Sequence, residues 1–172
     1  KSGLMSACRW PLWKDENVRY LTSARVIMIQ YRSSTTYGVL LHQEGNPTLL
    51  ASSGEAHRIE ECMPWIDDYV PIGILEEPGL VESTVRDDIA KRMKDWGVAD
   101  GNIGLDGHTF MQRAALDKYL PDATFVDGEM FMYMSRVQKT PDEVACLHQA
   151  CAIADAVTIT ALNTAVPGVR EF

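Results

Sequence analysis

Extended apolar segments alternate with amphipathic helical segments along most of this chain, and that alternation restricts its fold more than any other feature. Residues 37–42 and 48–51 flank a Glu-Gly-Asn-Pro turn and predict a β-hairpin. Further strands are predicted at 68–74, 102–106 and 123–127, the first an edge strand because it contains Pro71. The pattern predicts an α/β fold in which a mixed sheet is covered by helices on both faces.

The predicted helices have identifiable boundaries. Two of them follow capping boxes, Ser52 with Glu55 and Thr109 with Gln112, in which each side chain satisfies a backbone N–H at the helix start. A third helix carries an apolar stripe whose members are four residues apart, namely Val81, Val85, Ile89 and Met93. Gly97 follows it where a left-handed C-cap is expected.

The last predicted helix is longer and more apolar than the others. Its start, Thr140-Pro141-Asp142-Glu143, combines an N-cap, a proline in the first turn and a capping-box glutamate. A wide apolar face then extends to Ala161 and needs a partner. Because the chain starts at Lys1 rather than Met and stops soon after this helix, we expect a fragment. Residues 1–134 are predicted to form one domain, and residues 135–172 a linker and the first helix of a truncated second domain.

Charge and cysteine content limit the expected partners and compartment. The chain has 16 Lys and Arg against 24 Asp and Glu, a net charge of −8, which disfavours nucleic acid and anionic membrane surfaces as partners. Uninterrupted apolar runs are far shorter than the roughly 18 residues typical of a membrane-spanning helix, so no membrane association is expected. The four cysteines show no C-x-x-C spacing, which favours a reduced, cytoplasmic protein.

No familiar catalytic motif is present. The sequence lacks G-x-G-x-x-G, G-x-x-x-x-G-K-[ST], H-E-x-x-H and G-x-S-x-G, and its four histidines lie on four different predicted elements. We therefore predict no catalytic and no metal-ligating residue. The irregular stretch between Tyr20 and Tyr37, which contains Tyr31 and Arg32, has the character of a functional loop, although an ordinary strand and polar turn remain an alternative. An arginine fork beside a tyrosine ring could clamp a substrate carboxylate or cation.

Two groups of residues carry a resemblance to a known family. Residues 17–22, followed by a loop and Tyr37-Gly38, resemble the opening of the N-terminal domain of creatinase, prolidase and aminopeptidase P, the pita-bread metallohydrolases. The junction of the two domains in that family is similar to Phe125-Val126-Asp127, Arg136-x-x-Lys139-Thr140-x-x-Glu143-Val144-x-x-Leu147-x-x-Ala150 and Pro167-Gly168-Val169-x-Glu171. The chain departs from the family at His148, where relatives have Arg or Lys, and at Thr22-Ser23-Ala24, where Thr-Gly or Ser-Gly is common.

The resemblance implies a ribonuclease-H-like N-terminal domain followed by the first helix of a pita-bread domain. It implies a non-catalytic part of a two-metal Xaa-Pro dipeptidase- or aminopeptidase-like hydrolase, one that makes subunit contacts in a homodimer and forms one wall of the cleft for a small peptide or small-molecule substrate. The two divalent metals, Mn, Co or Zn, belong to the missing catalytic domain, and this fragment alone is expected to be inactive. Tyr31 and Arg32 are the nearest counterparts of an aromatic residue and an arginine in the creatinase pocket.

Alternatives remain open from the sequence. The parent protein could be a creatinase-like amidinohydrolase or a lyase that acts on a small zwitterion. From a different class, the chain could be a free-standing α/β dimerisation or binding module with no enzymatic parent.

Overall fold

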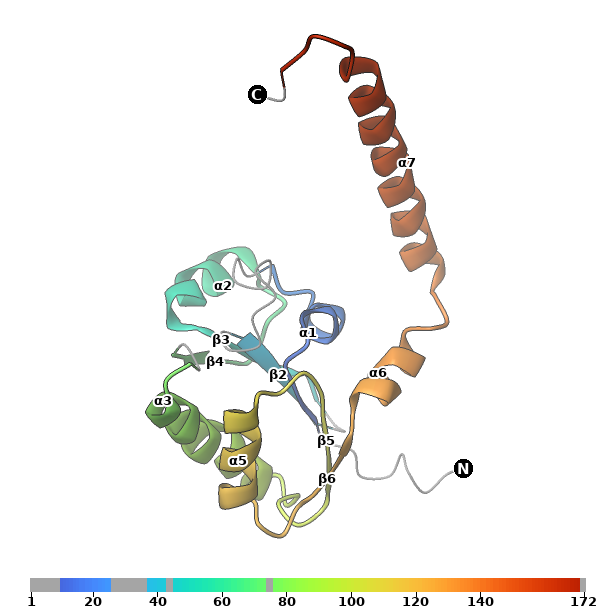
Figure 1. Cartoon of the computed structure of the whole chain (residues 1–172). Coiled ribbons are helices and arrows are strands. Elements are labelled where there is room, and N and C mark those ends of the chain that lie inside the picture. Colours follow the sequence, from blue (N-terminus) through green and yellow to red (C-terminus); the bar gives the residue numbers. More distant parts are fainter. Residues whose placement is uncertain (1–9, 26–36, 43–44, 74–75, 171–172) are drawn as a thin grey trace. The chain divides into compact units, whose positions relative to one another are not determined.

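The computed structural model describes residues 10–25, 37–42, 45–73 and 76–170 (Figure 1). The chain divides into two compact units, Lys1–Met132 and Tyr133–Phe172, and each is considered by itself. The domain boundary predicted after residue 134 concerns the domains of the parent protein and stays a prediction.

The strands of the first unit form a mixed sheet. Four strands pair in the order β1-β2-β3-β4, with bounds Trp10–Leu12, Tyr37–Leu41, Thr48–Ser52 and Tyr69–Ile72. The predicted hairpin is confirmed, because β2 and β3 are antiparallel with Tyr37 opposite Ala51, whereas β4 joins β3 in parallel at the edge. A parallel pair, β5 (Asn102–Leu105) and β6 (Thr124–Asp127), contacts this sheet through β1 and β5.

Side chains of the central strands alternate between two apolar cores. Leu40 and Leu50 point into a core completed by α3 (Pro78–Ser83), η3 (Thr84–Ala90), α4 (Lys91–Asp95) and α5 (Phe110–Tyr119). Val39 and Leu49 point into the second core with α1 (Asp15–Thr22) and α2 (Ala56–Cys62). Figure 1 shows α3 and α5 on one side of the sheet and α1 and α2 on the other. The predicted α/β fold with helices on both faces is confirmed.

The stripe of residues spaced by four is buried through a change in helix type. Val81, Val85, Ile89 and Met93 are all at most 1% exposed. On an α-helix a residue four positions on lies about 40° past its predecessor, so the stripe would drift away from the core. The middle of the stripe lies in η3, a π-helical segment, where each residue turns through a smaller angle. The wider turn offsets the drift and keeps the stripe facing the sheet.

One of the two predicted capping boxes in this unit forms. At α5 the Gln112 N–H donates to Thr109 Oγ1 over 3.2 Å, and the Thr109 N–H donates to Gln112 Oε1 over 2.7 Å. The box predicted at Ser52 is wrong: Ser52 ends β3, opposite Ile72, and a 3₁₀ turn (Ser53–Glu55) precedes α2. This turn delays the start of the α-helix to Ala56, and Ser52 makes no side-chain cap.

Trp10 fills the joint between β1 and the parallel strand pair. Its indole lies against the backbone of Gly104 and Gly128, where an added Cβ would come within 2.1 and 2.7 Å of the ring. Phe131, on α6 (Glu129–Ser135), stacks on Trp10 with ring centroids 4.8 Å apart. Glycine is therefore required at both positions by close packing against a large, rigid ring.

The C-cap of α1 is strained. Ser23 has φ 52°, the only positive φ of a non-glycine residue in the described part of the chain, and its N–H donates to the Arg19 carbonyl over 2.8 Å. Glycine is the usual residue in this left-handed position.

We therefore expect Ser23→Gly to stabilise the protein by about 0.5–1 kcal/mol, since relief of the backbone strain exceeds the entropy that glycine adds to the unfolded chain. Urea denaturation would measure the gain. A loss of stability would show that the Ser23 side chain contributes more than its backbone strain costs.

Candidate functional site

The predicted substrate-side residues, Tyr31 and Arg32, lie outside the described residues, and their role stays a prediction. The described chain reaches Arg25 on one side of them and resumes at Tyr37 at the start of β2. Arg25 is the described residue that directly precedes this stretch.

Trp65 contacts the end of α1 and the residues that follow it. Its indole N–H donates to the Thr22 carbonyl over 3.0 Å, and the Arg25 guanidinium lies 5.7 Å from the centre of the ring. The Arg25 backbone N–H donates to Met63 Sδ over 3.3 Å, which holds the Arg25 backbone beside the end of α2. Trp65 remains 43% exposed, unlike the buried Trp10 and Trp13. Both the indole and the neighbouring guanidinium are exposed and therefore accessible to a ligand or partner.

A hollow of about 200 Å³ lies beside Trp65, and we call it the Trp65 hollow. Its lining combines apolar side chains with a polar rim, formed together by Leu21, Thr22, Ser23, Asn46, Pro47, Trp65, Ile66 and Asp67. On the rim, Asn46 Nδ2 donates to Asp67 Oδ2 and holds that carboxylate in place. No carboxylate forms an ion pair with Arg25 within the described ranges. Unpaired positive and negative groups thus lie near an apolar surface.

A second hollow, of about 300 Å³, lies at the carboxyl ends of β5 and β6 and includes several charged side chains. Asp106 is 2% exposed and accepts N–H bonds from Trp13 (2.5 Å), Lys14 (3.2 Å) and Asn17 Nδ2 (2.5 Å). Burial raises the pKa of the Asp106 carboxyl above its ordinary value, and these three hydrogen bonds oppose the rise. This carboxyl therefore attaches the β1–α1 junction to the end of β5.

The other charged groups of the second hollow also have partners. Lys14 Nζ pairs with Glu129, and Arg113 bonds Asp117 over 3.0 Å while lying 4.5 Å from the centre of the Phe125 ring. Asp127 Oδ1 accepts N–H bonds from Glu129 and Met130. Because these charged groups are bonded to other parts of the fold, they are less available to a ligand. The Trp65 hollow is therefore the better candidate site.

The histidines lie apart along the chain. His57 is on α2, 3.3 Å from Glu61, and His148 is on α7 (Pro141–Thr164), whereas His108 precedes α5 and His42 follows β2, beside Trp96. Within the described ranges, no three His, Cys, Asp or Glu residues are grouped so that they could hold a metal ion.

Sequence reasoning did not find the pairing of Arg25 with Trp65. The two residues are 40 positions apart and share no local motif, so only the packing of α1 against the turn after α2 brings them together.

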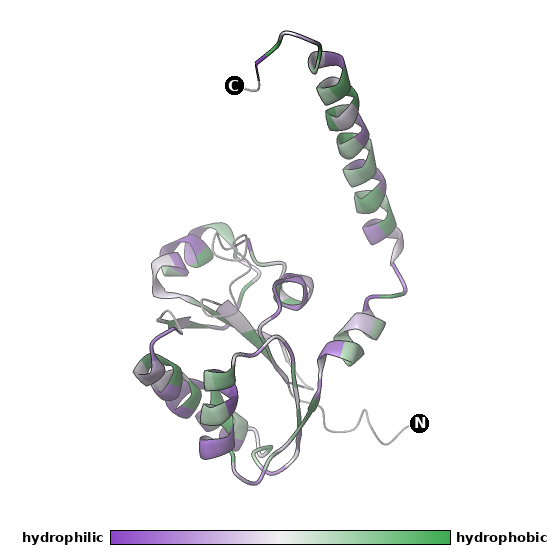
Figure 2. Cartoon of the chain, viewed as in Figure 1, coloured by the Kyte–Doolittle hydropathy of each residue, from purple (hydrophilic) through white to green (hydrophobic). Residues whose placement is uncertain are grey.

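The long helix α7 forms as predicted, and its surface is apolar. The Thr140 N–H donates to Glu143 Oε2 over 2.7 Å and the Glu143 N–H to Thr140 Oγ1 over 3.2 Å, which confirms the capping box. Green apolar positions run along the helix in Figure 2, and its large side chains are exposed, from Val144 at 41% to Leu162 at 71%. This helix needs a partner surface to bury these groups.

By length and composition, α7 is also long and apolar enough to cross a membrane. Counting uninterrupted apolar runs does not detect it, because polar residues interrupt the apolar ones along the helix. The expectation that the chain has no membrane association stays a prediction. Core helices of globular proteins meet the same criterion, so this property alone does not assign α7 to a membrane.

We expect Thr140→Ala to destabilise the start of α7 by about 1 kcal/mol, because the Glu143 N–H loses its side-chain acceptor, Thr140 Oγ1. Amide hydrogen exchange over the first turns would detect the change as faster exchange. Thr158→Ala is the matched control, since that hydroxyl bonds only the carbonyl of Ala154 within the helix. Equal exchange in the two variants would contradict a stabilising cap.

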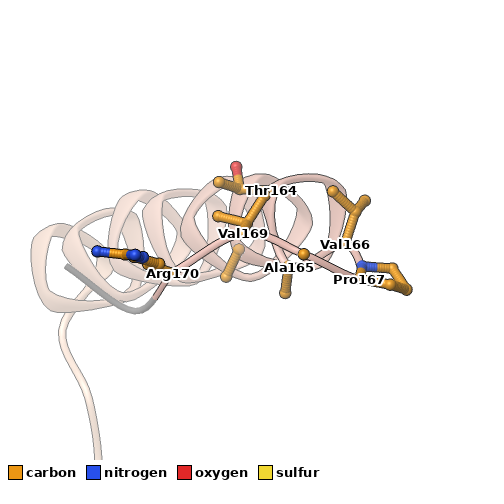
Figure 3. A pocket seen from close by; sticks show the side chains of 8 residues that line it. Thr164, Ala165, Val166, Pro167, Val169 and Arg170 are labelled. Atoms are coloured by element: carbon orange, nitrogen blue, oxygen red, sulfur yellow. The ribbon is translucent and has the colours of Figure 1, made fainter.

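An open hollow of about 670 Å³ follows α7 (Figure 3). It is lined by Ala161 and residues 164–170, where Gly168 has φ 93° and the Val169 N–H donates to the Val166 carbonyl over 3.2 Å. Arg170 is the single charged side chain in this lining. The hollow follows from the turn itself and has no arrangement of groups suited to catalysis.

Comparison with known proteins gives a family and a fold. The family described as Creatinase/Prolidase N-terminal domain matches residues 12–138. No protein of curated function matches the sequence. Because the matched segment covers most of the first unit and stops before α7, it assigns the α/β part of the chain.

Solved structures agree in fold. A prolidase from Pyrococcus horikoshii OT3 is 18% identical with a TM-score of 0.64, over 96% of this chain and 41% of its own. An X-Pro aminopeptidase from Thermotoga maritima MSB8 is 12% identical with a TM-score of 0.64, over 98% and 44%. The N-terminal domain of a Xaa-Pro dipeptidase from Lactobacillus brevis is 16% identical with a TM-score of 0.54, over 77% and 92%. The chain thus spans about two fifths of the length of the first two. With the family match, this shows that the chain belongs to the creatinase/prolidase N-terminal domain family.

Proposed function

We propose that this chain is the non-catalytic N-terminal domain of a two-metal Xaa-Pro dipeptidase- or aminopeptidase-like hydrolase, joined to the first helix of the catalytic domain. In this role the first unit contributes subunit contacts in a cytoplasmic homodimer and forms one wall of the substrate cleft. Tyr31 and Arg32 are proposed to contact the substrate on that wall. The substrate is a small peptide, bound remote from the metals by its carboxylate or side chain.

The observation that carries this proposal is the position of α7 relative to the family match. The match ends at residue 138, and α7 starts at Pro141 with its apolar surface exposed. The two longer relatives align over 96% and 98% of this chain, whereas the isolated N-terminal domain from Lactobacillus brevis aligns over 77%. This difference supports placing α7 with the second domain, whose core would cover the exposed side chains.

The two divalent metals of the proposed parent, Mn, Co or Zn, do not fit the described residues, which provide no cluster of ligands. When bound in such enzymes, paired metals polarise a carbonyl and supply hydroxide. We place these metals outside this chain and assign no step of the reaction to its residues. What this domain supplies is substrate selection, through groups that contact parts of the substrate remote from the reacting bond.

The test uses the full-length protein that contains this chain. We expect it to hydrolyse Xaa-Pro peptides after loading with Mn, and Arg32→Ala to lower kcat/KM by about tenfold or more, roughly 1.4 kcal/mol of transition-state stabilisation. Metal content and Tm should change little. Arg58→Ala, an exposed arginine on α2, is the matched control. Unchanged kcat/KM in Arg32→Ala would remove this loop from the substrate site, and hydrolysis of creatine instead of peptides would favour the amidinohydrolase.

A further inference from the structure

We propose that the Trp65 hollow binds a small zwitterion, a free apolar α-amino acid, with Arg25 receiving its carboxylate and Asp67 its ammonium group. This site is separate from the proposed peptidase activity, because it consists of described residues of the first unit alone.

The cationic side of the site is an oriented arginine. The Arg25 guanidinium borders the hollow through Trp65: its central carbon lies 5.7 Å from the centre of that ring, and this cation–π contact leaves its N–H groups able to donate. No carboxylate of the described chain forms an ion pair with them. A carboxylate matches this planar fork in two parallel hydrogen bonds, which is the geometry that arginine binds best. An external carboxylate is therefore the group that Arg25 lacks.

The anionic side of the site is Asp67. Asn46 Nδ2 donates to one oxygen of this carboxylate, which orients it on the rim of the hollow. Asp67 has no cationic partner among the ion pairs of the described residues. An ammonium group supplies both the charge and the donors that the second oxygen can accept.

Size and lining select the body of the ligand. The hollow of about 200 Å³ corresponds to roughly seven water volumes, which suits a single amino acid rather than a longer peptide. Leu21, Pro47 and Ile66 form an apolar lining beside the Trp65 indole. An apolar side chain would bury its surface there while its two charges remain at the rim.

The test is a titration of the 172-residue chain with L-leucine and L-proline, followed through the Trp65 indole N–H resonance, which Trp65→Phe assigns by removing it. We expect a saturable shift in the millimolar range. N-acetyl-L-leucine lacks the ammonium and L-leucinamide lacks the carboxylate, and both should bind at least about tenfold more weakly. The site is absent if no saturable shift occurs or if the capped compounds bind equally.

Variants separate the charge pair from general surface binding. Arg25→Gln and Asp67→Asn should each weaken L-leucine binding at least about tenfold while Tm stays unchanged, because both side chains are exposed. Arg58→Gln and Asp122→Asn, exposed charges elsewhere, should bind as the unmodified chain does. Unchanged affinity in Arg25→Gln would overturn the proposal. The result does not depend on peptide hydrolysis, so failure here and failure of the proposed activity are distinguishable.

Discussion

Gly104→Ala is expected to destabilise the first unit by about 3 kcal/mol, at the upper end of the usual cost of overpacking a core. The new Cβ would lie 2.1 Å from Trp10 Cε3, and the indole cannot withdraw because Gly128 and Phe131 also contact it. The strain would fall on the joint between β1 and β5, which is needed to hold the two groups of strands together. Urea denaturation would measure the loss.

Two further variants test the cause of this loss. Gly54→Ala places its Cβ 3.9 Å from the nearest neighbour, Ser52 Oγ, and should change stability by no more than about 0.5 kcal/mol. In the Trp10→Leu background, the cost of Gly104→Ala should fall, because a smaller and more flexible side chain can move away. An equal cost in both backgrounds would show that Trp10 is not the obstacle.

Asp106→Ala is expected to cost about 3 kcal/mol or more. The variant leaves three donors without their acceptor: the buried Trp13 N–H and Asn17 amide, and the partly buried Lys14 N–H. Each buried donor left unsatisfied costs roughly 1–3 kcal/mol. Chemical denaturation monitored by near-UV circular dichroism would report the loss, since the Trp13 backbone is bonded directly to Asp106.

Asp106→Asn should cost far less than Asp106→Ala. Its side-chain oxygen can still accept from Trp13 and Lys14. A rotation of the Asn17 amide lets Asn17 Oδ1, which has no hydrogen-bond partner among the described residues, accept from the new amide. A loss as large as that of Asp106→Ala would show that the negative charge itself is required.

The pH dependence of these two proteins distinguishes charge from hydrogen bonding. Because burial raises the folded-state pKa of Asp106, folding favours its protonated form. The unmodified protein is therefore most stable relative to Asp106→Asn below the ordinary carboxyl pKa of about 4, and this advantage decreases as the pH rises through the folded-state pKa. Urea midpoints measured from acid to neutral pH would reveal the trend. An advantage that grows with pH would contradict a raised pKa.

Local sequence patterns determined most of the secondary structure. The hairpin, the capping boxes at Thr109 and Thr140, and the buried stripe that includes Val85 all depend on residues within a few positions of one another. Such interactions form between residues close together in the chain, so the spacing of residue types in the sequence predicts them. The capping box predicted at Ser52 did not form, because a non-local contact took precedence. Ser52 pairs with β4 as the end of β3, and a 3₁₀ turn moves the start of the helix.

The sequence by itself also determined the family resemblance, which depends on short motifs in a fixed order along the chain. It determined the apolar, capped helix α7 as well, because that pattern lies in consecutive residues. Only the tertiary structure decided which distant residues meet. Asp106 receives hydrogen bonds from residues 89 to 93 positions earlier, and Trp65 meets Arg25 across the packing of α1 and α2. These contacts depend on the order of strands in the sheet and on the packing of helices against it, which no local spacing encodes.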